Sequence, residues 1–326
     1  MIKNNLFKFA TKELSQDAFI CWLMNFAHSD HLGENPILTE CAKELLAKML
    51  KIQDTLVVTS IDRQYKNIDV LIQVNNKYNI IIEDKTFTSE HSDQINRYRK
   101  MLENENFQNI ICVYYKIVEE NFTGHVDVQI TRKDLIDVFS KYINTAKNAI
   151  FTDYYENLLE IETETKAYMN TKIELWRIEY NHVYRGFFSH LINDNIISLS
   201  RGGGWGYIPN QSKGFWGLWW FYLGNAELNA CGLFETLVDD VYLQIEDNLI
   251  AVKMTGVTEK SNEVRWSLFD YFKSRTPEFQ KKVFKNGKHM TIGYITYDEK
   301  NYKEKINLMQ DIMESIANGE YKFKVN

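Results

Sequence analysis

The chain has 326 residues, of which 44% are apolar and 14% aromatic, so it can bury one large core or two ordinary ones. Its net charge of −6 argues against a protein that coats nucleic acid by charge alone, but leaves room for a local basic groove. No run of about 18 apolar residues occurs, so no membrane span is expected. Four distant cysteines predict neither a zinc site nor a disulfide framework, and the first residues lack a signal-peptide core, so we expect a cytoplasmic protein.

The first half of the chain has the pattern of an α/β domain. Apolar residues at helical spacing and β-branched runs predict, in chain order, helices at 15–26 and 36–49, strands at 56–65, 68–74 and 78–85, a helix at 92–103, strands at 109–116 and 126–130, and a helix at 133–142. The order helix, three strands, helix, strand is typical of a mixed central β-sheet flanked by helices.

The second half predicts a separate α+β region, with a boundary near residue 165 and domains at 1–165 and 166–326. The glycine-rich segment at 201–207 is expected to form a flexible turn, because no Gly-Lys-Ser/Thr follows it to make a phosphate loop. Four tryptophans could stack on unpaired bases, but an aromatic core is the commoner explanation. They are Trp205, Trp216, Trp219 and Trp220. The function of this half is not predicted.

The strands at 68–74 and 78–85 carry the most informative pattern. The polar triplet Asn75-Asn76-Lys77 separates them and predicts a β-hairpin. Asp69 and Glu83 each lie seven residues from Asn76, so they are expected directly opposite each other, with Cβ atoms roughly 5 Å apart. Lys85 follows Glu83 by two residues and is expected on the same face. Opposed carboxylates destabilise a sheet, and a cation bound between them would remove that repulsion.

These residue types suit metal-assisted hydrolysis of phosphodiesters. Mg²⁺ prefers carboxylate and carbonyl oxygens, so Asp69 and Glu83 are candidate ligands, and the backbone carbonyl of Asp84 is a third. Lys85 is the candidate catalytic cation, placed to orient water or stabilise the transition state. The alternative is an ordinary surface ion pair, since Glu-x-Lys recurs at residues 164–166. The first occurrence differs because it follows an isoleucine-rich strand and faces an aspartate across a turn.

Asp69 and the segment Glu83-Asp84-Lys85 resemble the active-site signature of the PD-(D/E)XK nuclease superfamily. The segment at 13–23 is similar to the first helix of a bacterial branch, in which an acidic residue precedes a Ser-x-x-x-Phe-x-x-Trp-Leu pattern, often with a His-x-Gly downstream, here at 31–33. The segment at 94–98 resembles the Gln-x-x-x-Tyr motif of RecB-like members. One departure is Ile68, which stands where the superfamily often has proline. The resemblance implies a restriction-endonuclease-like core.

The RecB-like motif supplies two further candidate catalytic residues, Gln94 and Tyr98. They are four residues apart and share one helix face, where they could touch a phosphate or orient Lys85; the alternative is a solvated helix face. Arg97 and Lys100 lie on other faces and are candidate nucleic-acid contacts, with solvated charge as the alternative for each.

The first predicted helix adds a candidate metal ligand. Glu13 could supply a further carboxylate, or it could be a helix-start residue favoured by the helix dipole. Asp17 is interpreted as a first-turn dipole partner and His31 as a loop residue, rather than as ligands.

Together these features predict a nuclease that uses Mg²⁺ or Mn²⁺ and acts on nucleic acid, with DNA favoured over RNA by the resemblance alone. The main alternative is a catalytically idle nuclease fold that binds nucleic acid or a protein partner. The intact acidic and lysine positions argue against it. The oligomeric state is not predicted.

Overall fold

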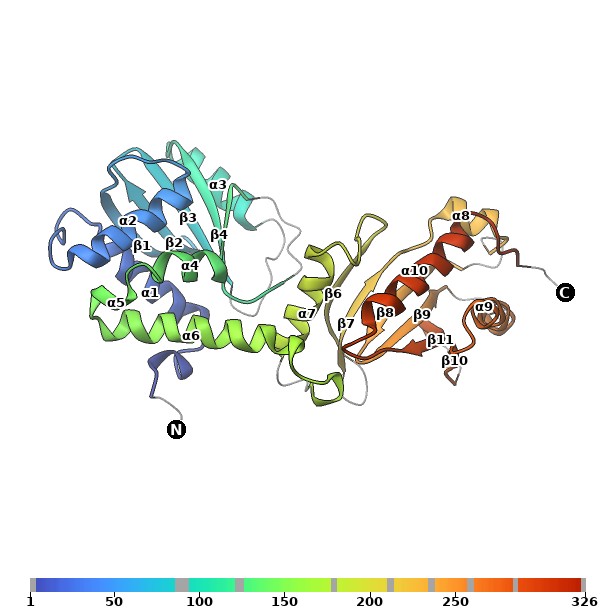
Figure 1. Ribbon diagram of the computed structural model, residues 1–326. Coiled ribbons are helices and arrows are strands. Elements are labelled where there is room, and N and C mark those ends of the chain that lie inside the picture. Colours follow the sequence, from blue (N-terminus) through green and yellow to red (C-terminus); the bar gives the residue numbers. More distant parts are fainter. Residues whose placement is uncertain are drawn as a thin grey trace. The chain divides into compact units, whose positions relative to one another are not determined.

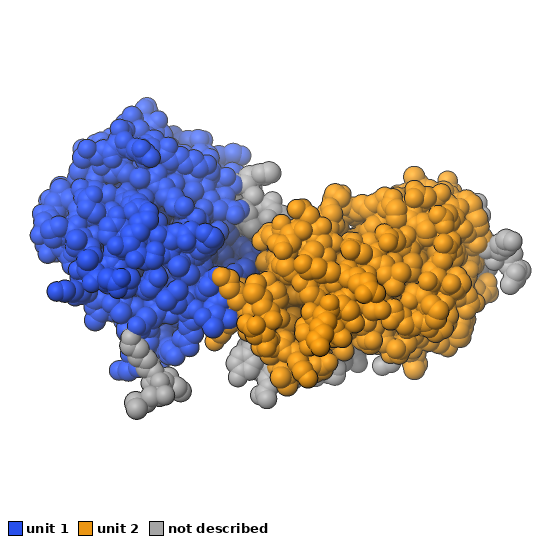
Figure 2. All heavy atoms as spheres, viewed as in Figure 1, with its two compact units in different colours: residues 1–163 blue, residues 164–326 orange. Residues whose placement is uncertain are grey.

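The computed structural model describes residues 4–85, 94–120, 126–176, 181–209, 214–233, 238–256, 261–283 and 287–323. The chain divides into two compact units, residues 1–163 and 164–326 (Figure 2). Among the described residues, no helix has the length and apolar character needed to cross a membrane.

The first unit is built around a five-stranded sheet (Figure 1). Its elements are η1 (Leu6–Lys8), α1 (Glu13–Asn25), α2 (Pro36–Leu50), β1 (Val58–Tyr65), β2 (Ile68–Val74), β3 (Tyr78–Lys85), α3 (Gln94–Asn104), β4 (Ile110–Lys116), β5 (Val128–Thr131), α4 (Arg132–Phe139), α5 (Ile143–Ala146) and α6 (Ala149–Thr165). The strands follow chain order, with β1–β2–β3 antiparallel and β3–β4–β5 parallel. The expected mixed sheet flanked by helices is confirmed, although residues 92 and 93 of the expected third helix lie outside the described residues.

The two faces of this sheet carry separate hydrophobic cores, because side chains alternate along a strand. Ile80 and Ile82 of β3 pack in a cluster with residues of α1, α2, α4 and α6. Ile81 packs in a second cluster with Ile95 and Leu102 of α3. Strand β3 is therefore buried on both faces, which explains why its sequence is a continuous isoleucine run rather than an alternating one.

Local sequence signals set the ends of these elements. Asn75 and Asn76 adopt left-handed backbone angles, with φ of 54° and 50°, which asparagine tolerates and which turns β2 back into β3. The side chain of Asn35 accepts a hydrogen bond from the backbone N–H of Leu38, and Pro36 begins α2. These local signals fix where the hairpin turns and where α2 begins.

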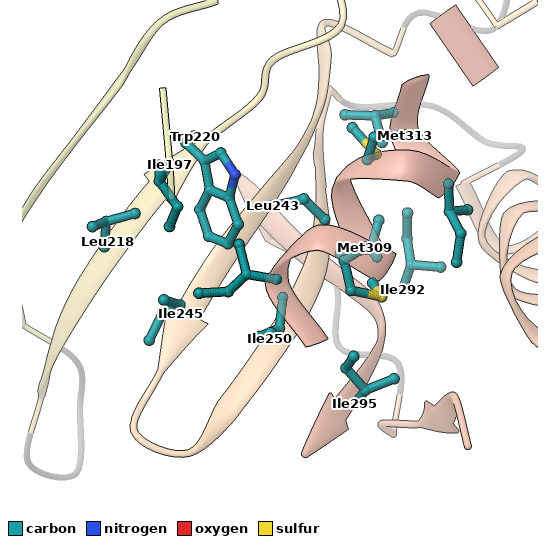
Figure 3. Packing of buried hydrophobic residues seen from close by; sticks show 14 of the residues in the cluster. Ile197, Leu218, Trp220, Leu243, Ile245, Ile250, Ile292, Ile295, Met309 and Met313 are labelled. Atoms are coloured by element: carbon teal, nitrogen blue, oxygen red, sulfur yellow. The ribbon is translucent and has the colours of Figure 1, made fainter. Parts of the chain in front are cut away.

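The second unit has a six-stranded, wholly antiparallel sheet in the order β10-β11-β9-β8-β7-β6. Its elements are η2 (Lys166–Met169), η3 (Ile173–Leu175), α7 (Asn181–Asn193), β6 (Gly203–Ile208), β7 (Phe215–Trp220), α8 (Asn225–Ala230), β8 (Asp240–Glu246), β9 (Leu249–Thr255), α9 (Ser261–Arg275), β10 (Gln280–Lys281), β11 (His289–Thr296) and α10 (Tyr302–Ala317). One large hydrophobic cluster joins the sheet to α7, α9 and α10. In Figure 3 the methionines of α10, Met309 and Met313, lie against the sheet residues Leu243 and Ile292.

The glycine-rich segment is not the flexible turn that the sequence predicts. Gly203–Ile208 forms strand β6, which pairs with β7 from Gly203↔Trp220 to Ile208↔Phe215. Glycine is required at position 203, where φ is 140° and a Cβ atom would lie 2.4 Å from the carbonyl oxygen of Trp219. The glycines therefore allow close approach to a tryptophan-rich partner strand, and composition alone does not reveal that partner.

The core interpretation of the tryptophans is confirmed for three of the four. Trp205, Trp216 and Trp220 are buried in the hydrophobic cluster of the second unit. Figure 3 shows the Trp220 indole beside Ile197, and its ring nitrogen donates a hydrogen bond to Gln310 at 3.0 Å. Trp219 is only half-buried and alternates to the other face of β7.

Candidate active site

Asp69, Glu83 and Lys85 converge at one end of the β2–β3 hairpin. The strands pair from Val74↔Tyr78 to Val70↔Ile82, which is the expected register, and Asp69 and Glu83 are the next opposed positions. The Lys85 Nζ atom lies 2.6 Å from Glu83 Oε1 and 3.7 Å from Asp69 Oδ2. The backbone N–H of Asp84 also donates to Asp69 Oδ2, at 3.1 Å. All three side chains thus meet on one face of the sheet.

Lys85 supplies the positive charge between these carboxylates. The Glu83 side chain is completely buried, whereas the side chains of Lys85 and Asp69 are 11% and 18% exposed. Burial alone would lower the pKa of Lys85, but the hydrogen bond and charge of Glu83, together with Asp69, raise it above its ordinary value. The Lys85 ammonium therefore already relieves part of the Asp69–Glu83 repulsion, and a bound cation would have to relieve only the remainder.

The donor set suits a hard divalent cation. Asp69 and Glu83 offer carboxylate oxygens from adjacent strands, and Mg²⁺ is commonly held by one or two carboxylates while it keeps several waters. Within the described ranges, no group of three or more His, Cys, Asp or Glu side chains gathers closely enough to hold a metal ion. The two hairpin carboxylates are the acids that Lys85 joins here, and among the described residues no third acid, Glu13 included, gathers with them in such a group.

Helix α3 borders the same face of the sheet. Gln94 Nε2 donates a hydrogen bond to the Tyr98 hydroxyl at 2.7 Å, so the two candidate residues form one unit on a single helix face. Burial raises the pKa of Tyr98; Gln94 opposes this rise, and the charges of Glu83 and Asp69 add to it. Arg97 and Lys100 are exposed, as a contact to a nucleic-acid backbone would require.

Helix α1 approaches the hairpin with two acids, and the interpretation of Asp17 as a first-turn dipole partner is wrong. The helix begins at Glu13, so Asp17 lies in its second turn, where it is 1% exposed. Glu13 is half-buried and is the acid of the first turn. Its charge makes the smallest contribution to the raised pKa of Lys85. His31 lies in a turn, as expected, 2.7 Å from Glu34 Oε1.

The burial of Asp17 is what the sequence interpretation missed. Burial raises its pKa to about 7, Asp69 and Glu13 reinforce the rise, and Arg63 opposes it. Burial also raises the pKa of Asp84 well above its usual range, with Asp17 adding to the effect. The available signal was spacing, because Asp17 follows Glu13 by four residues and shares its helix face.

Asp17→Asn should remove a pH-dependent loss of stability. Asp17 has a pKa of about 7 in the folded state and an ordinary pKa of 3.8 in the unfolded state. The free energy of unfolding of the wild type therefore falls as the pH rises from about 3.8 to about 7. We therefore expect the variant to gain more in Tm over the wild type at pH 8 than at pH 5. Thermal unfolding in metal-free buffer at both pH values measures this, and an equal difference at the two pH values would contradict it.

Comparison with known proteins decides the family. The model of the PD-(D/E)XK nuclease superfamily matches residues 4–185, which is more than half of the chain. The chain belongs to the PD-(D/E)XK nuclease superfamily. The mixed five-stranded sheet with flanking helices is the restriction-endonuclease-like fold of this superfamily. No curated protein and no solved structure matches the chain.

Proposed function

We propose that this superfamily member is a Mg²⁺- or Mn²⁺-dependent nuclease that hydrolyses phosphodiester bonds in DNA and acts in the cytoplasm. The observation that carries the proposal is the meeting of Asp69, Glu83 and Lys85 at one hairpin end, with the Lys85 ammonium 2.6 Å from Glu83. Two carboxylates and an ammonium on one rigid sheet face suit electrostatic stabilisation of a phosphate under attack. The four cysteines are unpaired, which suits a reducing compartment.

The proposed roles follow from the position and chemistry of each side chain. Asp69 and Glu83 would hold the metal, with Glu13 and the Asp84 carbonyl as further candidate ligands. When bound, the metal supplies Lewis-acid polarisation of the phosphate and makes water a stronger nucleophile. Lys85 would donate a hydrogen bond to the attacking water or to a phosphate oxygen, where negative charge develops.

Helix α3 would position the substrate. The paired Gln94 and Tyr98 side chains offer an amide and a phenol for one phosphate, or for holding Lys85 in place. Exposed Arg97 and Lys100 would contact the nucleic-acid backbone, which contributes affinity without reading sequence. We further propose that residues 1–165 carry the nuclease core and that 166–326 form an accessory α+β region.

Incubation with DNA tests the proposed activity. Linear duplex, circular duplex and single-stranded DNA are incubated with the wild type in Mg²⁺, in Mn²⁺ and in a chelator, and products are separated by size. We expect metal-dependent cleavage, and cleavage of the circular substrate would identify an endonuclease. Absence of cleavage in every arm, together with DNA binding, would favour the catalytically idle fold instead.

Divalent metal should raise the Tm of the wild type and leave that of an Asp69→Asn, Glu83→Gln double variant unchanged. A ligand that binds only the folded state adds about 2.7 kcal/mol at a hundredfold excess over its dissociation constant. Thermal unfolding over a Mg²⁺ titration measures this. An Asp137→Asn variant is the matched control, because Asp137 is a half-exposed acid of α4 that pairs with Lys133. Equal shifts in the wild type and the double variant would show that metal binds elsewhere.

A further inference from the structure

The residue between Glu83 and Lys85 on β3 faces away from the candidate active site. Asp84 lies between Glu83 and Lys85, and strand alternation sends its side chain to the α1 side of the sheet. There it is completely buried, and Gln16 of α1 donates a hydrogen bond from Nε2 to Asp84 Oδ1 at 2.7 Å. A buried polar group is costly unless it is hydrogen-bonded, so the contact between Gln16 and the Asp84 carboxyl group has a structural reason to persist.

The Gln16 amide is held from its other side as well. The Tyr154 hydroxyl of α6 donates to Gln16 Oε1 at 2.8 Å, and it also lies 2.9 Å from the hydroxyl of Tyr115. Tyr115 is on β4, directly beside Asp84 in the parallel β3–β4 pair. The chain of contacts therefore leaves β3 at Asp84, passes through α1 and α6, and returns to the sheet at the neighbouring position.

The outer end of this chain is fixed by packing. The Tyr154 ring stacks on Phe19 with centroids 3.6 Å apart, and it meets Phe7 edge-on at 4.9 Å. Tyr154 and Tyr115 are both completely buried or nearly so. Their hydroxyls can thus keep the Gln16 amide in one orientation, with its carbonyl towards Tyr154 and its NH₂ towards Asp84.

We propose that Gln16 and Tyr154 are positioning residues that anchor the end of β3 through Asp84 and so hold Glu83 and Lys85 towards the substrate. The proposal rests on the proposed nuclease function. Because alternate residues of a strand point to opposite faces, fixing Asp84 on one face fixes the rotation of the strand at Glu83 and Lys85 on the other. Rotation of this strand end would move the carboxylate and the ammonium together, and small displacements of reacting groups lower turnover strongly.

Two variants test the anchor, with a matched control. Gln16→Leu removes the amide hydrogen bonds to Asp84 and Tyr154 at similar volume, and Tyr154→Phe removes one hydroxyl while keeping the ring contacts. Tyr142→Phe is the control, because Tyr142 donates a hydrogen bond at 2.7 Å to Glu44, a residue of α2 outside this network. We expect kcat for DNA cleavage to fall about tenfold in Gln16→Leu, a few-fold in Tyr154→Phe and not in Tyr142→Phe, with KM for DNA within about twofold of the wild type throughout.

Hydrogen exchange measured by mass spectrometry provides a second readout that needs no activity. Amides in 80–85 should exchange at least about fivefold faster in Gln16→Leu than in the wild type, while Tyr142→Phe leaves them unchanged. Unchanged exchange of the 80–85 amides in Gln16→Leu would overturn the anchor. So would a fall in kcat that is the same in Gln16→Leu and Tyr142→Phe when the two variants lose the same Tm. If the wild type cleaves no DNA but amides in 80–85 still exchange faster in Gln16→Leu, the anchor is upheld and the proposed nuclease function is overturned.

Discussion

Asp69→Asn and Glu83→Gln should each reduce DNA cleavage to the level seen in chelator, because each removes one of the two carboxylates proposed to hold the metal. Neither change alters the shape of the side chain, so the β2–β3 pairing and the fold should persist. Cleavage rates at saturating DNA over a Mg²⁺ series measure the effect, with Asp137→Asn as the acid control. Full activity in either variant would contradict the proposal that Asp69 and Glu83 hold the metal.

The two positions should differ in stability, because Lys85 lies 2.6 Å from Glu83 and 3.7 Å from Asp69. Truncating one partner of a buried ion pair leaves the other charge uncompensated and costs about 3–5 kcal/mol when both are fully buried. Lys85 is slightly exposed and keeps Asp69 nearby, so the loss in Glu83→Ala should be smaller. We expect Glu83→Ala to lower the metal-free Tm more than Asp69→Ala does, and the reverse order would contradict the close Glu83–Lys85 pair.

Lys85→Ala should separate chemistry from metal binding. Removing a group that stabilises charge in the transition state typically lowers turnover by about 10²- to 10³-fold. Metal affinity should not fall, because the variant loses a positive charge that competes for the same two carboxylates. Single-turnover cleavage at saturating Mg²⁺ and DNA measures the chemical step. Lys66→Ala is the control, since Lys66 pairs with Glu105 on the surface and lies at the β1–β2 turn.

Lys85→Ala should also change the Tm of the protein, both without metal and with Mg²⁺. Without the ammonium, the buried Glu83 carboxylate and Asp69 face each other, so the metal-free Tm should fall. Mg²⁺ should then raise the Tm of Lys85→Ala by more than it raises the Tm of the wild type. Normal turnover in Lys85→Ala would mean that Lys85 is only a structural strand-end residue. A smaller metal-induced rise in Tm than in the wild type would contradict the competition between the ammonium and the metal.

The hairpin could be predicted from sequence because its determinants are local. The two asparagines of the turn set the register, and the period of two along a strand sets which side chains share a face. These rules place Asp69 opposite Glu83, and Lys85 beside them. The isoleucine run likewise indicates a strand buried on both sides, as β3 is.

Tertiary packing decided the features that sequence left open or predicted wrongly. The burial of Asp17 depends on how α1 lies across the sheet, and no local pattern states this. The glycines at 203–206 form a strand because β7 brings Trp219 and Trp220 against them, a partner more than ten residues away. The position of the Lys85 ammonium beside Glu83 follows from the charges gathered around it, whereas spacing specifies only its face. Local rules set which face a side chain occupies, but its contacts depend on residues that the chain brings together only on folding.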